Sequence, residues 1–407
     1  MRVVTSCVLL AVVWSAAAAA SAGPGPGDAN GDGRVDGADY QAWTSQFETV
    51  GDALSADFNG DGRVNGADYL VWASAFGQRY FYVDVAGDDG GAGTWDDPWR
   101  TIQRAADVAG PGATVFIAPG TYRDPWVARN SGTAGRPITF VGAGPDATVV
   151  DGAAHTSNCY YNDGHDYNAI EGMTLTGSYL DGCDIKRAVG VWLTNVVVHH
   201  NGWRRGRWDH GVAVYDSSGV YLADVTSHDN RANGVYIKNS TGGGLERVVA
   251  HHNGTQDNDD GITLQNCAEF GIDHCQAYQN AEDGIDVGGY EDTTLPMRDC
   301  VISDCVSTEN GGEGFAVSGT TSGLFDTRNI LIERCAATDN RGVGVQIYER
   351  AHHVECRQSV FNDNLRGYNI ITGAHDVWIH DGVIQGNTRG DGHIDDGLLN
   401  VVVENNQ

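Results

Sequence analysis

A ragged repeat of strand-like segments covers the second half of this 407-residue chain and restricts its fold more than any other feature. Each unit has alternating apolar residues, an Asn, a loop of variable length, and a Gly followed by more alternating apolar residues. Repeats of this length without a helical period predict a solenoid. The Asn residues, 23 to 30 positions apart, are Asn201, Asn230, Asn253, Asn280, Asn310, Asn340, Asn364 and Asn387. The Gly residues are Gly211, Gly234, Gly261, Gly284, Gly314, Gly344, Gly367 and Gly392.

The pattern also predicts how the coils stack. Apolar residues at the first and third places after each Gly, such as Val212 and Val214, point inward, and the second and fourth places point outward. By this count Ile394 takes the second outward place of the last coil. An Asn at the same corner of every coil can ladder its amide onto the next coil and satisfy the backbone there. We therefore expect a mainly β protein in which residues 79–407 form a parallel β-helix.

This stacking gathers carboxylates that are far apart in the sequence. Asp260, Asp283 and Glu313 precede the Gly of three consecutive coils, Asp286 takes the second outward place, and Glu282 borders the same corner. Like charges one strand spacing apart, about 4.8 Å, repel unless a cation lies between them. Oxygen ligands from adjacent coils suit calcium, so the sequence predicts one or more calcium ions in this groove. The alternative is a set of acidic turns that face water.

Three cysteines follow the same register. Cys275, Cys305 and Cys335 each lie five residues before the Asn of their coil, which predicts one inward column. Buried packing of free thiols is the first interpretation. Disulfides Cys300–Cys305 or Cys267–Cys275 are the alternative, because an exported compartment permits them.

A duplicated acidic segment precedes the solenoid. The stretch "DANGDGRVDGADYQAWTSQF" returns 29 residues later as "DFNGDGRVNGADYLVWASAF", with oxygen side chains at loop positions 1, 3, 5, 9 and 12 and Gly at position 6. This is the spacing of EF-hand loops, which surround a hard cation with oxygen atoms. The side chains are Asp28, Asn30, Asp32, Asp36, Asp39, Asp57, Asn59, Asp61, Asn65 and Asp68. A simple acidic linker is the alternative.

The two loops, each followed by a single exit helix, resemble a dockerin of type I over residues 23–78. The resemblance implies a small α-helical module that binds two calcium ions. It also implies a partner, which is a cohesin or another protein at a cell surface.

The first residues and the charge indicate where the protein works. Arg2, roughly fifteen apolar residues and the small-residue site Ala20-Ser21-Ala22 are typical of a secretory signal. We expect residues 1–22 to be removed and the mature protein to be secreted, extracellular or periplasmic, or attached at the cell surface. No later stretch is apolar for long enough to span a bilayer. The net charge of −29 argues against nucleic acid and anionic membranes as partners and favours cations.

Two stretches of the solenoid carry a further resemblance. The helical pattern "WRTIQRAADVA" ahead of "GATVFIAPGTY" resembles the cap that opens many secreted bacterial β-helix carbohydrate enzymes. The acidic run is similar to that of the family-nine pectate lyases, which are right-handed parallel β-helix proteins. Asp260 matches their Asp before Gly in one coil, and Glu282, Asp283 and Asp286 match the acidic-acidic-Gly-x-Asp run of the next.

The resemblance implies a reaction mechanism, but one catalytic residue of that mechanism is missing from this sequence. In the family these carboxylates bind calcium, the calcium binds a uronate and acidifies the proton beside its carboxylate, and a Lys removes that proton. The Lys belongs to a Gly-Phe-Lys stretch, which here reads "GFA" and ends at Ala316. Lys238 is the candidate replacement because it is the only Lys of the repeat region and faces outward one coil before Asp260. Tyr215, Tyr236 or an Arg are other candidates for the base. The alternative for Lys238 is that it is an ordinary surface residue without a catalytic role.

One loop is expected to contact the substrate. The stretch "HHNGWRRGRWDHG" is the densest basic segment of the chain and lies two coils from the carboxylates. Aromatic faces stack on sugar rings and Arg binds carboxylates in a fork. The residues expected to bind an anionic polysaccharide are Trp203, Arg204, Arg205, Arg207, Trp208, Tyr236 and Glu313. The alternative is a loop that forms ion pairs with its acidic neighbours.

Together these observations predict a calcium-dependent polysaccharide lyase that cleaves a uronate polymer such as pectate by β-elimination. A glycoside hydrolase on the same scaffold, with Asp286 and Glu313 as its two carboxylates, is one alternative. A non-catalytic carbohydrate-binding solenoid is the other, and it requires no replacement for the missing Lys.

Overall fold

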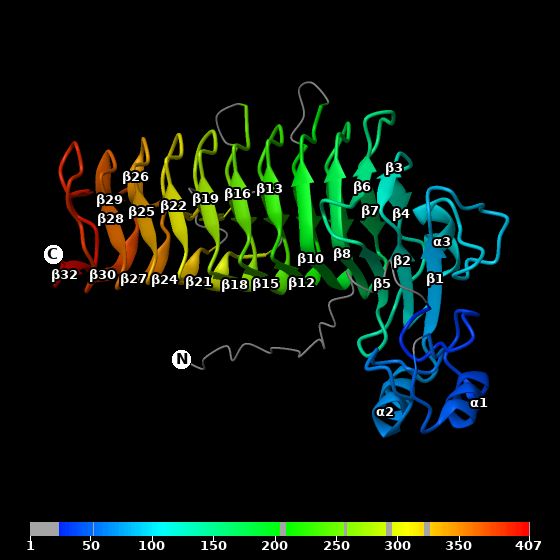
Figure 1. The fold of residues 1–407 in the computed structure, drawn as a ribbon. Coiled ribbons are helices and arrows are strands. Elements are labelled where there is room, and N and C mark those ends of the chain that lie inside the picture. The colour runs from blue at the N-terminus through cyan, green and yellow to red at the C-terminus, as the bar shows by residue number, and fades with distance from the viewer. Residues whose placement is uncertain are drawn as a thin grey trace.

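The computed structural model describes residues 24–406 except 52, 204–208, 256–258, 290–294 and 321–325. These residues form a long parallel β-helix with a small helical module beside its N-terminal end (Figure 1). The predicted fold class and the predicted order of the two parts are confirmed. The predicted signal segment, residues 1–22, lies outside the described residues.

Three helices and an eleven-stranded parallel sheet carry the features that matter most for function. The helices are α1 (Gly37–Gln46), α2 (Gly66–Ala75) and α3 (Ile102–Val108). The strands of this sheet, in spatial order, are β4 (Trp126–Val127), β7 (Tyr160–Asp163), β9 (Cys183–Lys186), β11 (Val212–Tyr215), β14 (Val235–Lys238), β17 (Ile262–Gln265), β20 (Ile285–Gly288), β23 (Phe315–Ser318), β26 (Val343–Tyr348), β29 (Arg366–Ile370) and β31 (Gly392–Ile394).

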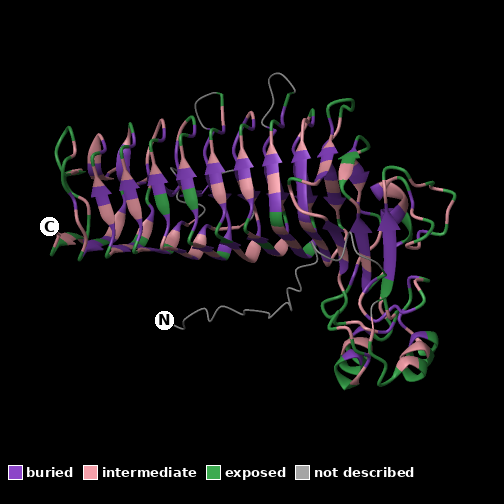
Figure 2. Ribbon diagram, viewed as in Figure 1, coloured by how far each residue is buried: buried purple, intermediate pink, exposed green. Residues whose placement is uncertain are grey.

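The rest of the solenoid wall is a 21-stranded parallel sheet that bends around the core. Its strands are β1 (Arg79–Val83), β2 (Ala113–Ile117), β3 (Gly120–Tyr122), β5 (Ile138–Gly142), β6 (Thr148–Asp151), β8 (Asn168–Thr176), β10 (Val189–His199), β12 (Ser218–Ala223), β13 (Thr226–His228), β15 (Thr241–Glu246), β16 (Val249–His251), β18 (Ala268–Asp273), β19 (Gln276–Tyr278), β21 (Arg298–Ser303), β22 (Val306–Thr308), β24 (Arg328–Glu333), β25 (Ala336–Thr338), β27 (His352–Arg357), β28 (Val360–Asn362), β30 (His375–His380) and β32 (Val401–Glu404). One continuous cluster of buried apolar side chains fills the space that the two sheets enclose. Figure 2 shows that buried residues recur along the strands of successive coils.

The predicted stacking register holds through the middle of the eleven-stranded sheet. Ala213 pairs with Tyr236, Tyr236 with Thr263, Thr263 with Asp286, and Asp286 with Ala316 on successive strands. Because side chains alternate along a strand, all five belong to the outward face of the sheet. The sheet therefore presents one long row of side chains that runs along the helix axis.

The register predicted for the last coil is wrong by one residue. Gly392 pairs with Tyr368 rather than with Gly367, and His393 rather than Ile394 takes the outward place. The reason is that Gly392 lies against the aromatic ring of Tyr368, where a Cβ atom would come within 1.9 Å of its Cζ atom. Gly392 therefore makes room for a ring and does not mark the corner that the other Gly residues mark.

The predicted asparagine ladder is present from Asn201 to Asn387. In each coil the backbone N–H of the ladder Asn donates to the side-chain oxygen of the Asn in the next coil, at 3.0 to 3.2 Å. The side-chain amide also donates to a backbone oxygen of the preceding coil, as Asn280 does to Ala250 at 3.1 Å. These bonds satisfy polar groups that the turn would otherwise leave buried and unpaired.

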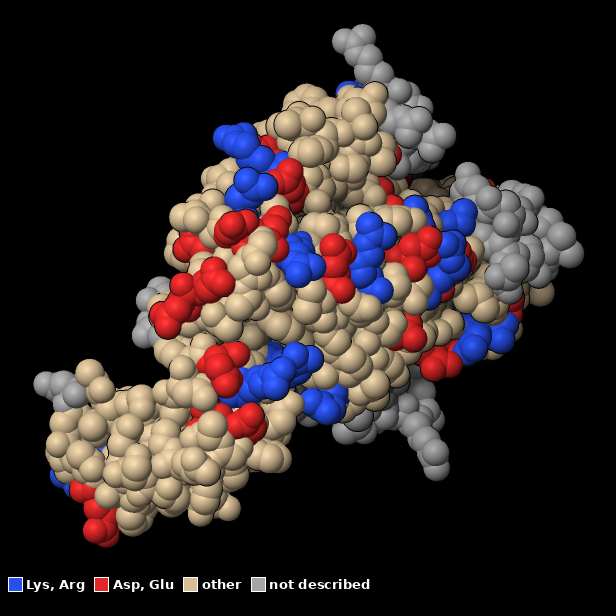
Figure 3. All heavy atoms as spheres, turned by 90° about the vertical axis from the view of Figure 1, so that its right-hand side faces the viewer, with Lys and Arg blue, Asp and Glu red and all other residues tan. Residues whose placement is uncertain are grey.

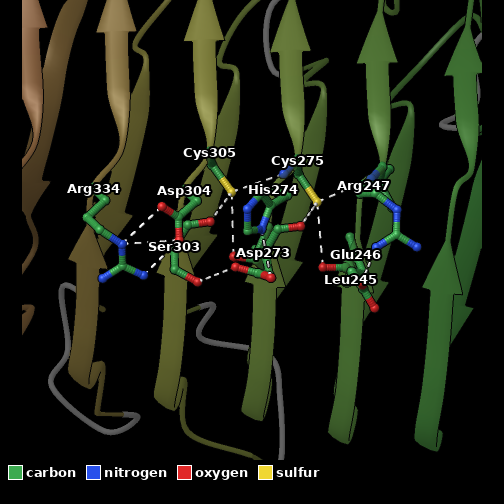
Figure 4. A network of polar contacts seen from close by, with 12 residues as sticks. Leu245, Glu246, Arg247, Asp273, His274, Cys275, Ser303, Asp304, Cys305 and Arg334 are labelled. Carbon is green, nitrogen blue, oxygen red and sulfur yellow. Dashed lines mark hydrogen bonds and ion pairs between the residues drawn. The ribbon is translucent and has the colours of Figure 1, made fainter. Parts of the chain in front are cut away.

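The cysteine column is present as well. Cys275 and Cys305 stack in neighbouring coils, where the backbone N–H of Cys275 donates to the sulfur of Cys305 at 3.4 Å (Figure 4). All eight cysteines of the described part of the chain are buried free thiols. The interpretation as buried packing is therefore confirmed, and neither Cys300–Cys305 nor Cys267–Cys275 is a disulfide in this structure.

The N-terminal end of the solenoid is covered by α3, and the helical module packs on the outer face of its first strands. Ile102 and Ala105 of α3 are buried in the main core, as expected for a helix that caps the first coil. The module packs Val35 against Tyr80 and Tyr82 of β1, and the N–H of Gly25 donates to the hydroxyl of Tyr82 at 2.6 Å. A solenoid needs a cap such as α3 because its end coil would otherwise expose its apolar interior.

Candidate functional site

The predicted column of carboxylates forms at the corner that precedes β17, β20 and β23, with Asp286 on the outward face of β20. We refer to Asp260, Glu282, Asp283, Asp286 and Glu313 as the acidic centre. Backbone bonds place its members in consecutive coils: Gly261 donates to the carbonyl of Asp283 at 2.9 Å, and Gly284 to that of Glu313 at 2.9 Å. Asp260 and Asp283 are buried, and the other three carboxylates are half-buried.

Hydrogen bonds between coils hold two of these carboxylates in place. The N–H of Asp283 donates to Asp260 at 3.1 Å, and the N–H of Glu313 donates to Asp283 at 2.6 Å. Thr263 donates its hydroxyl to Asp260 at 2.8 Å. The centre is therefore an ordered part of the stack rather than a set of loose turns.

Burial and mutual repulsion make the acidic centre reluctant to ionise. Burial raises the pKa of Asp260 to about 7, with Glu282 and Asp259 adding repulsion. Burial also raises the pKa of Asp283 and of Asp286 well above the usual range, and Glu313 and Asp260 respectively add to it. A bound cation would reverse this because it compensates the buried charge.

The Oδ1 atom of Asp286 is buried and makes no hydrogen bond to any described residue. Buried polar atoms are nearly always paired, so this oxygen is suited to a ligand from outside the chain. The donor set consists only of oxygen atoms from adjacent coils, which fits calcium. Residues Asp260, Glu282, Asp283 and Asp286 are those that would hold it.

Among the described residues, three metal-ligating atoms come within 4.8 Å of one another in two other groups, which are His352–His353–Asp376 and Asp273–His274–Asp304. The carboxylates of the acidic centre are not drawn together as closely, so a cation would have to gather them. His274 and Asp273 are paired with each other at 2.9 Å (Figure 4), and His274 is exposed. Such exposed pairs satisfy themselves, and they lack the buried unpaired oxygen of the acidic centre.

The other predicted residues lie as follows. Lys238 ends β14 on the outward face, two strands before Asp286, and is half-buried. Tyr236 lies on the same strand and donates its hydroxyl to Gln265 at 2.5 Å. Trp203 is 58% exposed. Arg204, Arg205, Arg207 and Trp208 lie outside the described residues. Ala316, in the place of the family's Lys, is buried beside Asp286 and has no group that takes a proton.

A second polar cluster, which the sequence did not predict, lies on the same face over β9, β11 and β14. Lys186 donates to Asp184 at 2.8 Å, and Asn158 donates to the same carboxylate at 3.3 Å. His210 stacks on the ring of Tyr236 with centroids 4.5 Å apart. We call these residues, with Asp181 and Tyr215, the lysine centre.

Burial sets the protonation of the lysine centre. It lowers the pKa of His210 to about 3, so the imidazole is neutral at ordinary pH. It raises the pKa of Asp181 and of Asp184, although Lys186 works against this. A signal for the cluster exists in the sequence, because "DGCDIK" repeats the Asp-Gly-x-Asp spacing of "EDGID". The two stretches also share a register, with Asp184 in the row of Asp286.

The loops of the helical module have the geometry that their spacing predicts. Asp28 accepts hydrogen bonds from the N–H groups of Gly31 and Gly33 at 2.8 and 2.9 Å. Asp39 and Asp68, at position 12 of the two loops, are buried. Burial raises the pKa of Asp28 to about 6, and Asp39 adds repulsion. Ten oxygen-bearing side chains in two such loops fit two calcium ions.

The surface of the module differs from that of the solenoid. Viewed from the N-terminal end, acidic side chains lie at the outer tip of the module and the rest of its visible surface carries few charges (Figure 3). Charges of both signs alternate over the visible part of the solenoid. Large apolar side chains of the module are exposed, among them Leu70 at 67% and Phe76 at 59%.

Fold and sites together define a carbohydrate-active type of β-helix with an attached EF-hand-like module. The model of the Pel9A-like right-handed β-helix region matches residues 81–377, so the chain belongs to this family. The dockerin type I model matches residues 26–74. Among the described residues no helix has the length and apolar character needed to cross a membrane.

Two solved structures share the fold at low identity, and one curated protein matches part of the sequence. The A-module of the mannuronan C-5 epimerase AlgE4 of Azotobacter vinelandii superposes with a TM-score of 0.55 at 18% identity, over 79% of this chain and 100% of that one. The periplasmic alginate epimerase AlgG gives 0.53 at 11% identity, over 84% and 89%. The protein YwoF of Bacillus subtilis (strain 168) is 32% identical over 127 residues, which is 30% of this chain and 26% of YwoF. The chain thus spans about a quarter of that relative.

Proposed function

We propose that this protein is an exported enzyme that cleaves a uronate-containing polysaccharide by calcium-dependent β-elimination. The observation that carries the proposal is the unpaired, buried Oδ1 atom of Asp286 within the acidic centre. An oxygen in this state needs a partner, and the neighbouring carboxylates make a divalent cation the favourable one.

The charges of the centre support a cation in the groove. When both are ionised, two carboxylates one strand spacing apart repel by about 3 kcal/mol at an effective dielectric constant of about 20. This repulsion lowers the stability of the fold unless a bound cation compensates the negative charges. Calcium bound there would attract the carboxylate of a uronosyl unit and acidify the proton on its C5 atom.

Lys238 is the proposed base that takes this proton. Its strand lies two steps from β20, a separation of about 10 Å along the sheet, which a long side chain and a sugar ring can span together. Ala316, which pairs with Asp286, has no group that accepts a proton, so the proposal takes the base from another strand of the same face. Trp203, Tyr236 and Glu313 would contact the polymer along the row, together with the Arg and Trp residues of the 204–208 loop.

The proposed setting is extracellular. Residues 1–22 would direct export, and the dockerin-type module would bind a cohesin-like protein at a surface. The exposed apolar side chains of α2 support this part of the proposal, because an unpaired apolar face on a small module suits a protein partner.

The direct test is a product assay with the full chain over polygalacturonate, polyglucuronate and polymannuronate, with calcium and with chelator. Elimination creates a C4=C5 double bond that absorbs in the ultraviolet. We expect absorbing product from at least one polymer. In Lys238→Met its rate should fall by about 100-fold or more, as for loss of a general base. Arg341→Met, at an exposed turn, is the matched control and should behave as wild type.

Other products would decide for the alternatives. New reducing ends without ultraviolet absorbance would indicate a hydrolase that uses Asp286 and Glu313. Binding of a polymer without any product would indicate a carbohydrate-binding solenoid. Full activity of Lys238→Met would place the base elsewhere.

A further inference from the structure

Tyr215 lies between the only two lysines of the chain, Lys186 and Lys238. In the eleven-stranded sheet it pairs with Lys186 of β9 on one side and with Lys238 of β14 on the other. All three residues end their strands at the fourth outward place, so they form a row with a strand spacing of about 4.8 Å. The two lysines of the chain therefore lie on the strands on either side of the Tyr215 phenol.

The hydroxyl of Tyr215 differs from those of the two neighbouring tyrosines, Tyr161 and Tyr236, on this face. The hydroxyl of Tyr161 donates to Asp163 at 3.1 Å, and that of Tyr236 donates to Gln265 at 2.5 Å. Among the described residues the hydroxyl of Tyr215 has no such acceptor, and its side chain is half-buried rather than enclosed. It is therefore available to a ligand on this face of the sheet.

Lys186 is held firmly in this row. Its Nζ atom is 2.8 Å from Asp184 and lies over the rings of Tyr161 and Tyr215, at 5.5 and 5.2 Å from their centroids. An ammonium has three N–H donors, and the contact with Asp184 occupies one of them. Asp184 is itself buried and bound by Asn158. Lys186 is thus positioned to bind an anionic group beside Tyr215.

On the basis of the function proposed above, we infer that Tyr215 is the general acid of the elimination. Lys238 takes the proton from C5, the electron pair of that bond forms the C4=C5 double bond, and the C4–O4 bond breaks with its electron pair on O4. The Tyr215 hydroxyl gives its proton to O4. Lys186 binds the carboxylate of the sugar on the leaving side, and solvent returns the proton from Lys238 to Tyr215.

The surroundings of Tyr215 suit an acid better than a base. Burial raises the pKa of its phenol, and Asp181 and Tyr236 add to this, so the resting side chain holds its proton. The phenolate that forms in the reaction lies between two ammonium groups, which stabilise it. His210, which stacks on Tyr236, is neutral. It therefore adds no positive charge that would lower the pKa of the Tyr215 phenol in the resting state.

The experiment compares two leaving groups on the full-length protein. One substrate is the polymer that the wild type cleaves, whose O4 needs a proton to leave. The other is an oligouronide with fluorine in place of the 4-oxygen, because fluoride leaves without a proton. Tyr215→Phe keeps the ring over Lys186 and removes only the hydroxyl. Tyr221→Phe, on the exposed side of β12, is the matched control.

We expect Tyr215→Phe to lower kcat on the polymer by about 100-fold or more with KM nearly unchanged, the range typical of general acid catalysis. Fluoride release, followed with an ion-selective electrode, should fall less than about threefold. An equal loss on both substrates, or no loss on either, would overturn the role of Tyr215 and leave the lyase proposal standing. A wild type that forms neither unsaturated product nor fluoride would overturn the lyase proposal and this role with it.

Discussion

The EF-hand-like loops and the acidic centre both gather carboxylates, but they do so in different ways. In the first loop Asp28 accepts hydrogen bonds from Gly31 and Gly33, and Asp39 accepts one from Ala29 at 2.8 Å, all within twelve residues. In the acidic centre Asp283 is bound by the N–H of Glu313, which is 30 residues away. One site is built by local sequence, and the other is built by stacked coils.

This difference predicts how each region behaves without a cation. The module has a small core around Val64 and Ala56, so we expect cations bound in its loops to supply much of its stability. The solenoid has a continuous core and an asparagine ladder along most of its length, neither of which involves the acidic centre. We therefore expect a cation to stabilise the fold of the module, whereas in the solenoid we expect it to bind a ligand without being required for the fold.

The largest expected effect is that of chelation on the module. Removal of calcium should unfold residues 28–76, because binding energy in such small loops is folding energy. The solenoid should persist. Hydrogen exchange of the full chain with and without chelator measures both parts at once. Unchanged protection of α1 and α2 in chelator would contradict the comparison.

A smaller effect is expected when one carboxylate of the acidic centre is neutralised. Asp286→Asn or Asp283→Asn should weaken calcium binding by the solenoid at least tenfold, which is about 1.4 kcal/mol. Titration calorimetry of the full chain should then show one strong site fewer, with the two module sites intact. Asp216→Asn, at an exposed turn, is the matched control. Identical titrations of wild type and both variants would remove calcium from the groove.

The smallest expected effect is a pH dependence of the metal-free solenoid. Burial raises the pKa of Asp260 from 3.8 to about 7. Between these two pH values the folded state keeps a proton on Asp260 that the unfolded state has lost. Stability should therefore fall as pH rises from about 4 to 7, since the unfolded state binds fewer protons in that range. In chelator, the melting temperature of wild type should drop by several degrees relative to Asp260→Asn between pH 5 and 8. A constant difference between the two proteins would show that Asp260 does not titrate as proposed.

Much of the fold could be predicted from the sequence because solenoid stacking is a nearest-neighbour rule. Equal distance from a repeated Gly placed Tyr236, Thr263, Asp286 and Ala316 in one row, as the strand pairing confirms. The rule failed at Gly392, where the ring of Tyr368 and not a corner requires the Gly. No local pattern distinguishes these two uses of the same residue.

The sequence by itself determined the two loops, the ladder, the cysteine column and the acidic centre, because each depends on spacing along the chain. Only the tertiary structure decided which side chains lack partners and which charges become neighbours. The Oδ1 atom of Asp286 is unpaired because of what surrounds it in three dimensions. Lys186 and Lys238 are 52 positions apart in the chain, yet the stack places one on each side of Tyr215. Burial and cross-coil contacts set these properties, and neither is a function of local spacing.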